Sequence, residues 1–500
     1  MNREEISSNT PSTISQTKKT INFNELMIKG DNSKYPLLAL LNILSVLLID
    51  GLEKFLYSFL IIPINDYFNF KEFETECCSA IFFLGLALGS MSGGYLTKNF
   101  KRETVLKSCS FSFVLLHLIF SIFYYRAIFF ICRFFIGFGL GIYTPICLNL
   151  YCEYLPSENR GFRLQVVWVS FSVANLFLIY IVMILMPNFQ SFQLKKVLLI
   201  SEIIPVISFI INIFTLYDSP RHLIINNEYD KAFEILENMN NNEKFTEDDK
   251  ISIINDIKCS QINCQVSEGN IKDMFNSYYR TTTLIIMLLF FITACGCFGI
   301  PVVTTFTSRQ LNINQGKEDN HSIIITQLII ALIGLISNIF AGFLINLKFL
   351  GRKGCLIISL IFEIVLCIFS INFPKFFAFL IGFSQFFANI FANVLIAYNV
   401  EVYLTKIRDI ASGFNLMIYR MFCMFSQFIF LQMNSFDYRV PYYSLACFSF
   451  IGIFFVYLLP YETTGKEIDS DFNFKENLLD LNKSDEGKSL LNDEDIKYYS

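Results

Sequence analysis

Hydrophobic residues in this chain of 500 residues gather into long runs separated by short polar turns. About 20 consecutive apolar residues are enough to cross the hydrocarbon core of a bilayer as a helix. Twelve runs reach about that length, and each predicts a membrane-spanning helix. They cover residues 36–62, 75–97, 104–124, 127–150, 162–186, 196–217, 281–304, 322–347, 353–372, 376–400, 410–432 and 441–459.

The runs fall into two sets of six, with the longest polar stretch between them. This predicts an all-α membrane protein of twelve transmembrane helices in two six-helix bundles. The expected parts are a polar N-terminal segment 1–35, a bundle 36–217, a loop 218–280, a bundle 281–460 and an acidic tail 461–500. Within the loop, apolar residues of Tyr229 to Met239 recur at the spacing of one helix face, which predicts a short amphipathic helix.

The composition agrees with a membrane protein. The chain is 54% hydrophobic and 16% charged, whereas a soluble chain has roughly a quarter of its residues charged. Lys and Arg concentrate in the first segment, the 218–280 loop and alternate turns, so the positive-inside rule predicts cytoplasmic termini. Asn320, in a glycosylation sequon, would then lie outside. We expect a multi-pass protein of the plasma membrane or an endomembrane, with a lipid bilayer around it and no nucleic-acid partner.

One block of sequence occurs twice, about 250 residues apart. Glu153 is followed seven positions later by Arg160, and Glu401 is followed seven positions later by Arg408. A basic turn precedes each copy, and Arg352 belongs to the second one. Such an offset, half the chain, indicates a duplicated architecture. Two parallel repeats in a membrane are typical of transporters, which bind their solute at the repeat interface.

Several short motifs follow one another along the chain: Asp50-Gly-Leu-Glu53, the glycine-rich stretch from Arg133 to Gly141, Asp218-Ser-Pro-Arg221, the Glu401 to Arg408 block, Arg420 and Glu462-Thr-Thr-Gly-Lys466. In this order they resemble the motifs of major facilitator superfamily transporters. The first motif and Arg420 are similar to those of the synaptic-vesicle-protein-related and organic-ion branches, and the turns are shared with sugar porters. The resemblance implies two bundles that rock about a midplane site, with spans six and nine at the periphery.

The chain departs from the family pattern in its turns. Lys98 and Lys348 stand where the family carries an Asp, and Leu404 replaces a Pro. The resemblance implies that this Asp helps a charge network to latch the cytoplasmic side. A non-transporting, receptor-like member of the same fold is therefore one alternative hypothesis.

Polar residues in apolar spans are the candidates for binding a solute. Gln385, Asn389 and Asn393 follow one another at four-residue intervals on an otherwise aromatic helix. Amides need partners, so this stripe is expected either to face a central cavity or to bond neighbouring helices. Gln165 and Trp168, one turn apart in the fifth span, are further candidates for the cavity wall, and a Trp is equally typical of a helix interface.

Ionisable residues in the spans are candidates for ion coupling because charge in hydrocarbon is costly. Asp50 and Glu53 form an acidic pair in the first span that could carry a proton, and Lys54 could instead pair with Asp50 locally. Arg133 opens a small or polar stripe on the fourth span that runs through Asn149, which we include among the substrate-binding candidates. The alternative for Arg133 is a structural ion pair.

The duplicated block provides candidates for a cytoplasmic gate. We expect Glu153, Arg160, Arg352, Glu401 and Arg408 to form ion pairs within or across the halves when this side is closed. Such pairs are weak in water, so their influence depends on partial burial.

The sequence as a whole predicts a monomeric secondary transporter that is not an enzyme, without cofactor or metal, since no phosphate-binding loop or metal-ligand spacing is present. Arg420, midway in the eleventh span, is the best candidate to bind an anionic group, unless it pairs with Asp50 or Glu53. We therefore predict transport of a small organic ion, aromatic or carboxylated, with a proton as co-substrate. A sugar is the alternative substrate.

Overall fold

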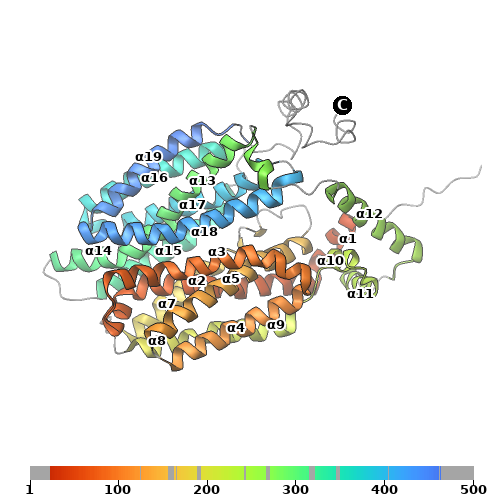
Figure 1. The fold of residues 1–500 in the computed structure, drawn as a ribbon, viewed down its shortest axis with the longest axis horizontal. Coiled ribbons are helices and arrows are strands. Elements are labelled where there is room, and N and C mark those ends of the chain that lie inside the picture. Colours follow the sequence, from red (N-terminus) through yellow and green to blue (C-terminus); the bar gives the residue numbers. More distant parts are fainter. Residues whose placement is uncertain are drawn as a thin grey trace, which may run out of the picture.

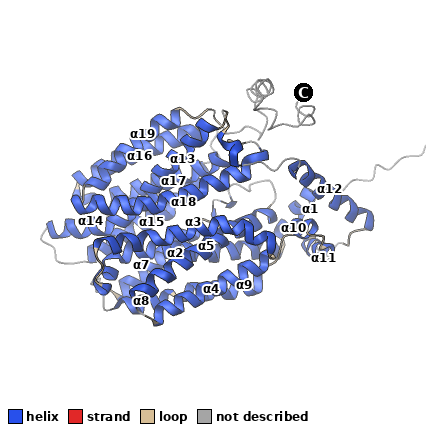
Figure 2. Ribbon diagram, viewed as in Figure 1, coloured by secondary structure: helices blue, strands red, loops and turns tan. Residues whose placement is uncertain are grey.

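A computed structural model describes residues 23–123, 125–155, 163–164, 166–187, 193–240, 244–265, 271–276, 278–314, 321–344, 350–403, 405–460 and 462. Its described residues form helices that run in two bundles side by side (Figure 1). No strand occurs in this part of the chain (Figure 2). The predicted all-α class is therefore confirmed.

The N-terminal half is an antiparallel bundle. Its helices are α2 (Lys34–Phe68), α3 (Glu72–Asn99), α4 (Arg102–Ile122), α5 (Arg126–Tyr154), α7 (Val169–Leu185), α8 (Leu194–Ser201) and α9 (Ile203–Thr215). A kink interrupts α2 at Leu60, three residues before Pro63, because the proline ring has no backbone N–H and crowds the preceding turn. The kink divides α2, which is longer than one crossing of a bilayer requires, into two helical segments.

The C-terminal half repeats this arrangement. It comprises α13 (Arg280–Ala294), η4 (Cys295–Gly299), α14 (Ile300–Asn314), α15 (His321–Leu344), α16 (Gly351–Asn372), η5 (Pro374–Phe376), α17 (Phe377–Glu401), α18 (Thr405–Phe436) and α19 (Val440–Tyr457). The segment η4 is a single π-helical turn that joins α13 to α14, and such turns are frequent at functional sites.

Eleven stretches of helix among the described residues are long and apolar enough to cross a membrane. The pair α8–α9 counts as one of them, and α13–α14 as another. The predicted span not counted among the eleven is the fifth, 162–186, which corresponds to α7, a strongly apolar helix of only 17 residues in the described chain. The count of twelve spans and the cytoplasmic termini stay predictions.

A group of short helices, which we call the cap, lies beyond one end of the bundles (Figure 1). It consists of α1 (Phe23–Lys29), η1 (Gly30–Asn32), α10 (Pro220–Ile225), α11 (Tyr229–Met239) and α12 (Glu247–Gln265). The amphipathic helix predicted from Tyr229 to Met239 has the bounds of α11, and its apolar face is buried. The predictions did not include α1, α10 or α12. A further short helix, η3 (Ile271–Phe275), precedes α13.

Close helix contacts hold each half together and join the two halves. Within the N-terminal half, Gly85 and Gly89 of α3 let the backbone of α5 approach, since an added Cβ would lie 2.2 Å and 2.1 Å from carbonyl oxygens of that helix. Between the halves, α3 packs on α18, α7 on α15, and α2 on α14. The region enclosed by these three helix pairs is where a site shared by both halves has to lie.

Candidate functional site

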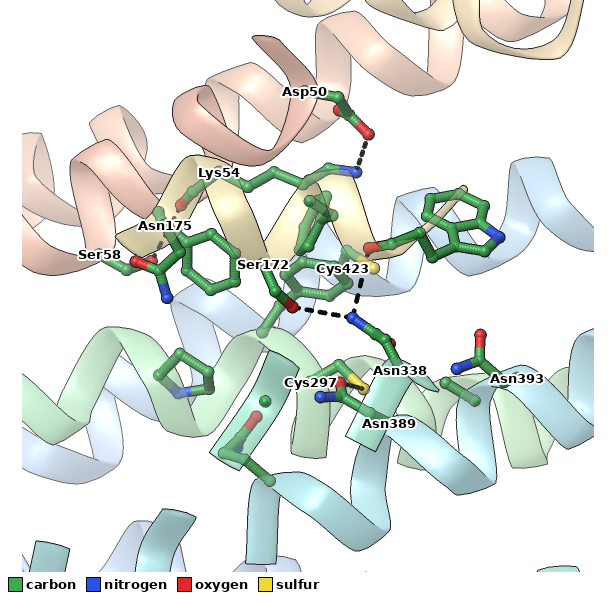
Figure 3. A pocket seen from close by; sticks show the side chains of 18 of the residues that line it. Asp50, Lys54, Ser58, Ser172, Asn175, Cys297, Asn338, Asn389, Asn393 and Cys423 are labelled. Atoms are coloured by element: carbon green, nitrogen blue, oxygen red, sulfur yellow. Dashed lines mark hydrogen bonds and ion pairs between the residues drawn. The ribbon is translucent and has the colours of Figure 1, made fainter. Parts of the chain in front are cut away.

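A cavity of about 280 Å³ lies between the two halves. Its polar and charged wall comes from both of them, as Figure 3 shows for part of the set. The N-terminal half contributes Asp50, Lys54, Ser58, Thr144, Ser172 and Asn175, and the C-terminal half contributes Thr304, Gln327, Asn338, Gln385, Asn389, Asn393 and Arg420. The location matches the interface of two repeats, where transporters bind their solute.

The predicted amide stripe of α17 faces this cavity, and Gln385, Asn389 and Asn393 all line it. Two of the three amides also bond neighbouring helices. Gln385 Nε2 donates to the Gly296 carbonyl oxygen at 2.7 Å, and Asn389 Nδ2 donates to Ser337 Oγ at 3.0 Å. The stripe therefore combines the two alternatives that the sequence left open, a cavity wall and interhelical bonding.

Asp50 and Lys54 form an ion pair inside the cavity. Lys54 Nζ donates to Asp50 Oδ2 at 2.7 Å, across one turn of α2 (Figure 3). The same ammonium lies 5.1 Å from the ring centre of Phe171 on α7 and 5.7 Å from that of Phe298 on η4. The local pair considered as an alternative is thus present, and it lies in the cavity wall between rings from opposite halves.

Arg420 lines the cavity from α18. Its Nη1 donates to the Leu86 carbonyl oxygen at 3.4 Å and to Ser90 Oγ, both on α3. Within the described part of the chain, no ion pair joins Arg420 to Asp50 or Glu53. The arginine of the C-terminal half is therefore held by the backbone and a hydroxyl of the N-terminal half.

Aromatic rings complete the wall. Phe55, Phe83, Phe171, Phe298, Tyr419 and Trp168 surround the polar groups. Trp168 is the single tryptophan of the chain, and its carbonyl oxygen accepts a hydrogen bond from Asn338 Nδ2 at 3.4 Å. Gln165, predicted beside it, lies outside the described residues. Asn149, the other predicted binding residue on this side, is exposed and is not among the lining residues. It follows Leu148, the last lining residue of α5, and each residue turns the helix by about 100°, so its side chain points to another side.

Glu53 is not among the residues that line the central cavity, although it was predicted to form an acidic pair with Asp50. Its carboxylate points into the N-terminal half, where Oε2 accepts from Arg133 Nη1 at 2.9 Å and Oε1 lies 2.7 Å from His117 Nε2. All three side chains are buried and border a separate small cavity of about 20 Å³. Residues three apart on a helix lie about 60° apart around its axis, and this offset is enough for Asp50 to line the cavity while Glu53 contacts Arg133 of α5 and His117 of α4.

His117 is a residue that the sequence interpretation missed. It is one of three histidines in the chain, on the apolar helix α4, and nothing nearby in the sequence marks it. Its Nδ1 bonds the Phe113 carbonyl oxygen at 2.7 Å, and so Nε2 is left to face Glu53. The one available signal was a His in the middle of an apolar span, which calls for a polar partner on another helix.

The π turn η4 exposes backbone carbonyls that two glutamines bind. Gln385 of α17 bonds Gly296, and Gln427 Nε2 of α18 donates to the Phe298 carbonyl oxygen at 2.6 Å. Gln427 Oε1 in turn accepts from Ser79 Oγ of α3. Gln427 therefore connects the turn, α18 and the opposite half, at the side of the cavity away from the cap.

The duplicated blocks form matching ion pairs at the cap end of each half. Arg102, at the start of α4, lies 3.0 Å from Glu153 near the end of α5. Arg352, near the start of α16, lies 2.8 Å from Glu401 at the end of α17. Ser219 Oγ also donates to Glu153. Each pair lies within one half.

The remaining predicted gate and turn residues lie outside the described part of the chain. The structure does not describe Arg160, Lys348, Leu404 or the sequon residue Asn320. It also does not describe the side chains of Lys98 and Arg408. The predicted pairing of Glu153 with Arg160 and of Glu401 with Arg408 therefore stays a prediction.

A family model described as "Sugar (and other) transporter" matches residues 21–471. Among curated proteins, the Xenopus laevis synaptic vesicle 2-related protein is 25% identical over 258 residues, which are 51% of this chain and 44% of that protein. The rat synaptic vesicle glycoprotein 2A is 23% identical over 294 residues, 51% of this chain and 39% of that protein. The matched stretches thus span less than half of these relatives.

Solved structures of similar fold include the inward-open Escherichia coli xylose transporter XylE. It has a TM-score of 0.68 and 17% identity, and the match covers 89% of this chain and 99% of that one. A second structure, the proton:xylose symporter XylE with 6-bromo-6-deoxy-D-glucose, has a TM-score of 0.62 and 18% identity, with 89% and 97% covered. At this identity the similarity establishes the fold, and it confirms the predicted architecture of the major facilitator type.

Proposed function

The chain belongs to the sugar (and other) transporter family of the major facilitator superfamily, and on that premise we propose that it is a secondary active transporter. It is a multi-pass integral membrane protein. In our proposal a small organic solute binds in the cavity between the halves, and the halves then rock to expose it alternately to the two sides. The single observation that carries the proposal is this cavity, with polar walls from both halves in an otherwise apolar membrane body.

The preferred substrate is an organic ion that carries a carboxylate. The charged residues of the cavity wall are Asp50, Lys54 and Arg420, so their formal charges leave an excess of one positive charge. Aromatic rings around these groups suit an aromatic body, since flat rings stack and bury well. An anion with an aromatic or other apolar portion fits both properties.

A sugar is the second candidate. The amides Asn175, Asn338, Asn389 and Asn393 line the cavity, and amides that both donate and accept suit hydroxyl groups. The family description names sugars, and a structural neighbour is described as a proton:xylose symporter. A sugar, however, carries no anionic group that could pair with Lys54 or Arg420.

We further propose that a proton is co-transported and that Asp50, Glu53 and Arg133 participate. Support comes from the burial of these groups and from the position of Asp50 in the cavity wall. Glu53 and Arg133 lie behind that wall, where protonation of the carboxylate would release the arginine and change the packing of α2 on α5. Gln385, Asn389, Asn393 and Arg420 remain our candidates for the substrate.

The pairs at the cap end are proposed to hold the helix ends of each half during this cycle. If Lys98 and Lys348 disable the latch that the family carries, the fold would bind a ligand without transporting it. That outcome is the alternative against which transport has to be tested.

The test is uptake into proteoliposomes with and without an inward proton gradient. A panel of labelled sugars, organic anions and organic cations would be offered to the wild type and Arg420→Ala. Arg439→Ala, which removes an exposed arginine after α18, is the matched control. Gradient-driven anion accumulation that only Arg420→Ala abolishes would support the proposal. Sugar uptake independent of Arg420 would favour the second candidate, and absence of flux for the whole panel would favour the non-transporting alternative.

A further inference from the structure

The Lys54 ammonium makes a single hydrogen bond, and it lies in the wall of the cavity where we propose that the solute binds. Lys54 Nζ donates to Asp50 Oδ2 and has no other hydrogen-bond acceptor among the described residues. An ammonium carries three donors. Its other neighbours are the Phe171 and Phe298 rings, which attract a cation without using its N–H groups in directional bonds. The side chain is 11% exposed, and that surface lies in the cavity.

Asp50 is incompletely satisfied in the same place. Its residue is 2% exposed, and Oδ1 has no hydrogen-bond partner in the described structure. A buried carboxylate normally accepts several hydrogen bonds, because each unmade bond costs free energy. The Asp50–Lys54 pair is therefore a weakly anchored contact on one helix, in contrast to the Glu53 carboxylate, which two other helices hold.

Arg420 is less available than Lys54. Its Nη1 is already bound to Leu86 and Ser90 of α3, across the interface of the halves. The other ionisable groups that face the cavity are Tyr419 and Cys423 of α18 and Cys297 of η4. The remaining lining residues of α5 and α7 are not ionisable. Of the two cations in this wall, Lys54 is thus the one that a ligand can bind with the smaller loss of existing hydrogen bonds.

We propose that the acidic group of the substrate takes the place of Asp50 at the Lys54 ammonium. In this exchange Lys54 is a specificity-determining residue, and Asp50 occupies the ammonium as an internal counter-ion while the site is empty. The ammonium that receives the incoming carboxylate lies over the Phe171 and Phe298 rings, which come from opposite halves, so binding takes place at a point where groups that move relative to each other meet. The inference rests on the proposed function and gives its site a substrate class, an aromatic carboxylate.

The exchange predicts opposite effects for the two partners. Lys54→Met removes the cation and is expected to weaken carboxylate binding by at least about tenfold. Asp50→Asn removes the competitor and is expected to tighten binding several-fold, although uptake falls if Asp50 serves in coupling. A fixed structural pair predicts instead that both variants weaken binding, because each would leave one charge buried alone.

Trp168 provides the measurement, since it is the single tryptophan and lines the cavity. Purified full-length protein would be titrated with benzoate, and with benzamide as the neutral analogue of the same shape, while tryptophan fluorescence is followed. Lys375→Met is the matched control, because Lys375 is exposed at η5, away from the lining residues. Trp168→Phe identifies signal that does not come from the cavity. Lys54→Arg, which keeps the charge, and the melting temperature of each variant separate lost binding from misfolding.

The expected result is saturable quenching of the wild type and the control by benzoate but not benzamide, weakened in Lys54→Met, retained in Lys54→Arg and strengthened in Asp50→Asn. A wild type that does not respond to benzoate, an unchanged Lys54→Met, or an Asp50→Asn that binds more weakly would overturn the inference. Sugar uptake without benzoate binding would refute the exchange and leave transport standing. Benzoate binding without flux of any solute would refute transport and leave the exchange standing.

Discussion

Arg133 of α5 and Glu53 of α2 lie 2.9 Å apart in the interior of the N-terminal half, with side chains 4% and 5% exposed. The guanidinium also lies 5.0 Å from the Phe82 ring centre and 5.4 Å from that of Tyr57. His117 binds the second carboxylate oxygen. The Glu53 carboxylate thus contacts nitrogen atoms of two residues on two other helices, behind the cavity wall.

Removing one member of this pair should destabilise the protein strongly. Arg133→Met leaves the Glu53 carboxylate buried with His117 alone, and loss of one partner of a buried pair costs about 3–5 kcal/mol. We expect a clear drop in the melting temperature of the detergent-solubilised protein. Adding Glu53→Gln to Arg133→Met should recover part of that loss, and a double variant no more stable than Arg133→Met would argue against the pair.

The pair at the cap end of the C-terminal half should tolerate exchange of its charges. Arg352→Glu alone places two acids together and should lower the initial uptake rate several-fold, as expected for a partly buried pair worth about 1 kcal/mol. Arg352→Glu combined with Glu401→Arg should restore most of the rate, since both residues lie within one half. Uptake by the double variant that stays as low as that of Arg352→Glu would show that other groups depend on the original orientation.

Two glycines of one helix should differ sharply in their tolerance of alanine. At Gly89 a Cβ would lie 2.1 Å from the Phe138 carbonyl oxygen, so α3 and α5 must separate. We expect Gly89→Ala to cost about 1–3 kcal/mol, the usual range for overpacking. Gly93→Ala is the control, because its Cβ would meet Ile142 at an ordinary 3.5 Å. Equal melting temperatures for the two variants would contradict this packing.

Glu228, between α10 and α11 of the cap, should not contribute to pH dependence in the neutral range. Hydrogen bonds from Lys101 and then Lys231 lower the pKa of Glu228 to about 2. Because the folded-state pKa lies below the ordinary value near 4.5, the stabilising contribution is fully present above that value and is lost as pH falls through about 2. Glu228→Gln should therefore leave the shape of the uptake curve between about pH 5 and pH 8 unchanged. A shifted curve would place a titrating group of the cap in the transport cycle.

Much of the fold could be predicted from hydrophobic runs, because length and apolar content determine which helices cross a bilayer. The amphipathic spacing also located α11 correctly. The run of 162–186 predicted a full span, whereas the described α7 begins at Val169. The helix α12 was missed because its polar residues hide any apolar face, and its stability depends on packing within the cap.

The site could be predicted only in part, since helix rotation is a tertiary property. The amide interval on α17 correctly indicated one face, because residues four apart share it. The i, i+3 spacing of Asp50 and Glu53 did not reveal that one faces the cavity and the other α4 and α5. The His117 contact joins positions 64 residues apart in sequence, and no local pattern encodes such a distance.

Glu462, which lies beyond the end of α19 at Tyr457, also stabilises the start of another helix. Glu462 Oε1 accepts from the Arg352 backbone N–H at 2.6 Å, and Oε2 accepts from that of Lys353 at 2.9 Å. It therefore satisfies free N–H groups in the first turn of α16, which begins 111 residues earlier, at Gly351. A purification tag or fluorescent fusion joined directly after Tyr457 would remove these two hydrogen bonds. Expression vectors should therefore retain the chain through Glu462 and place the added sequence beyond it.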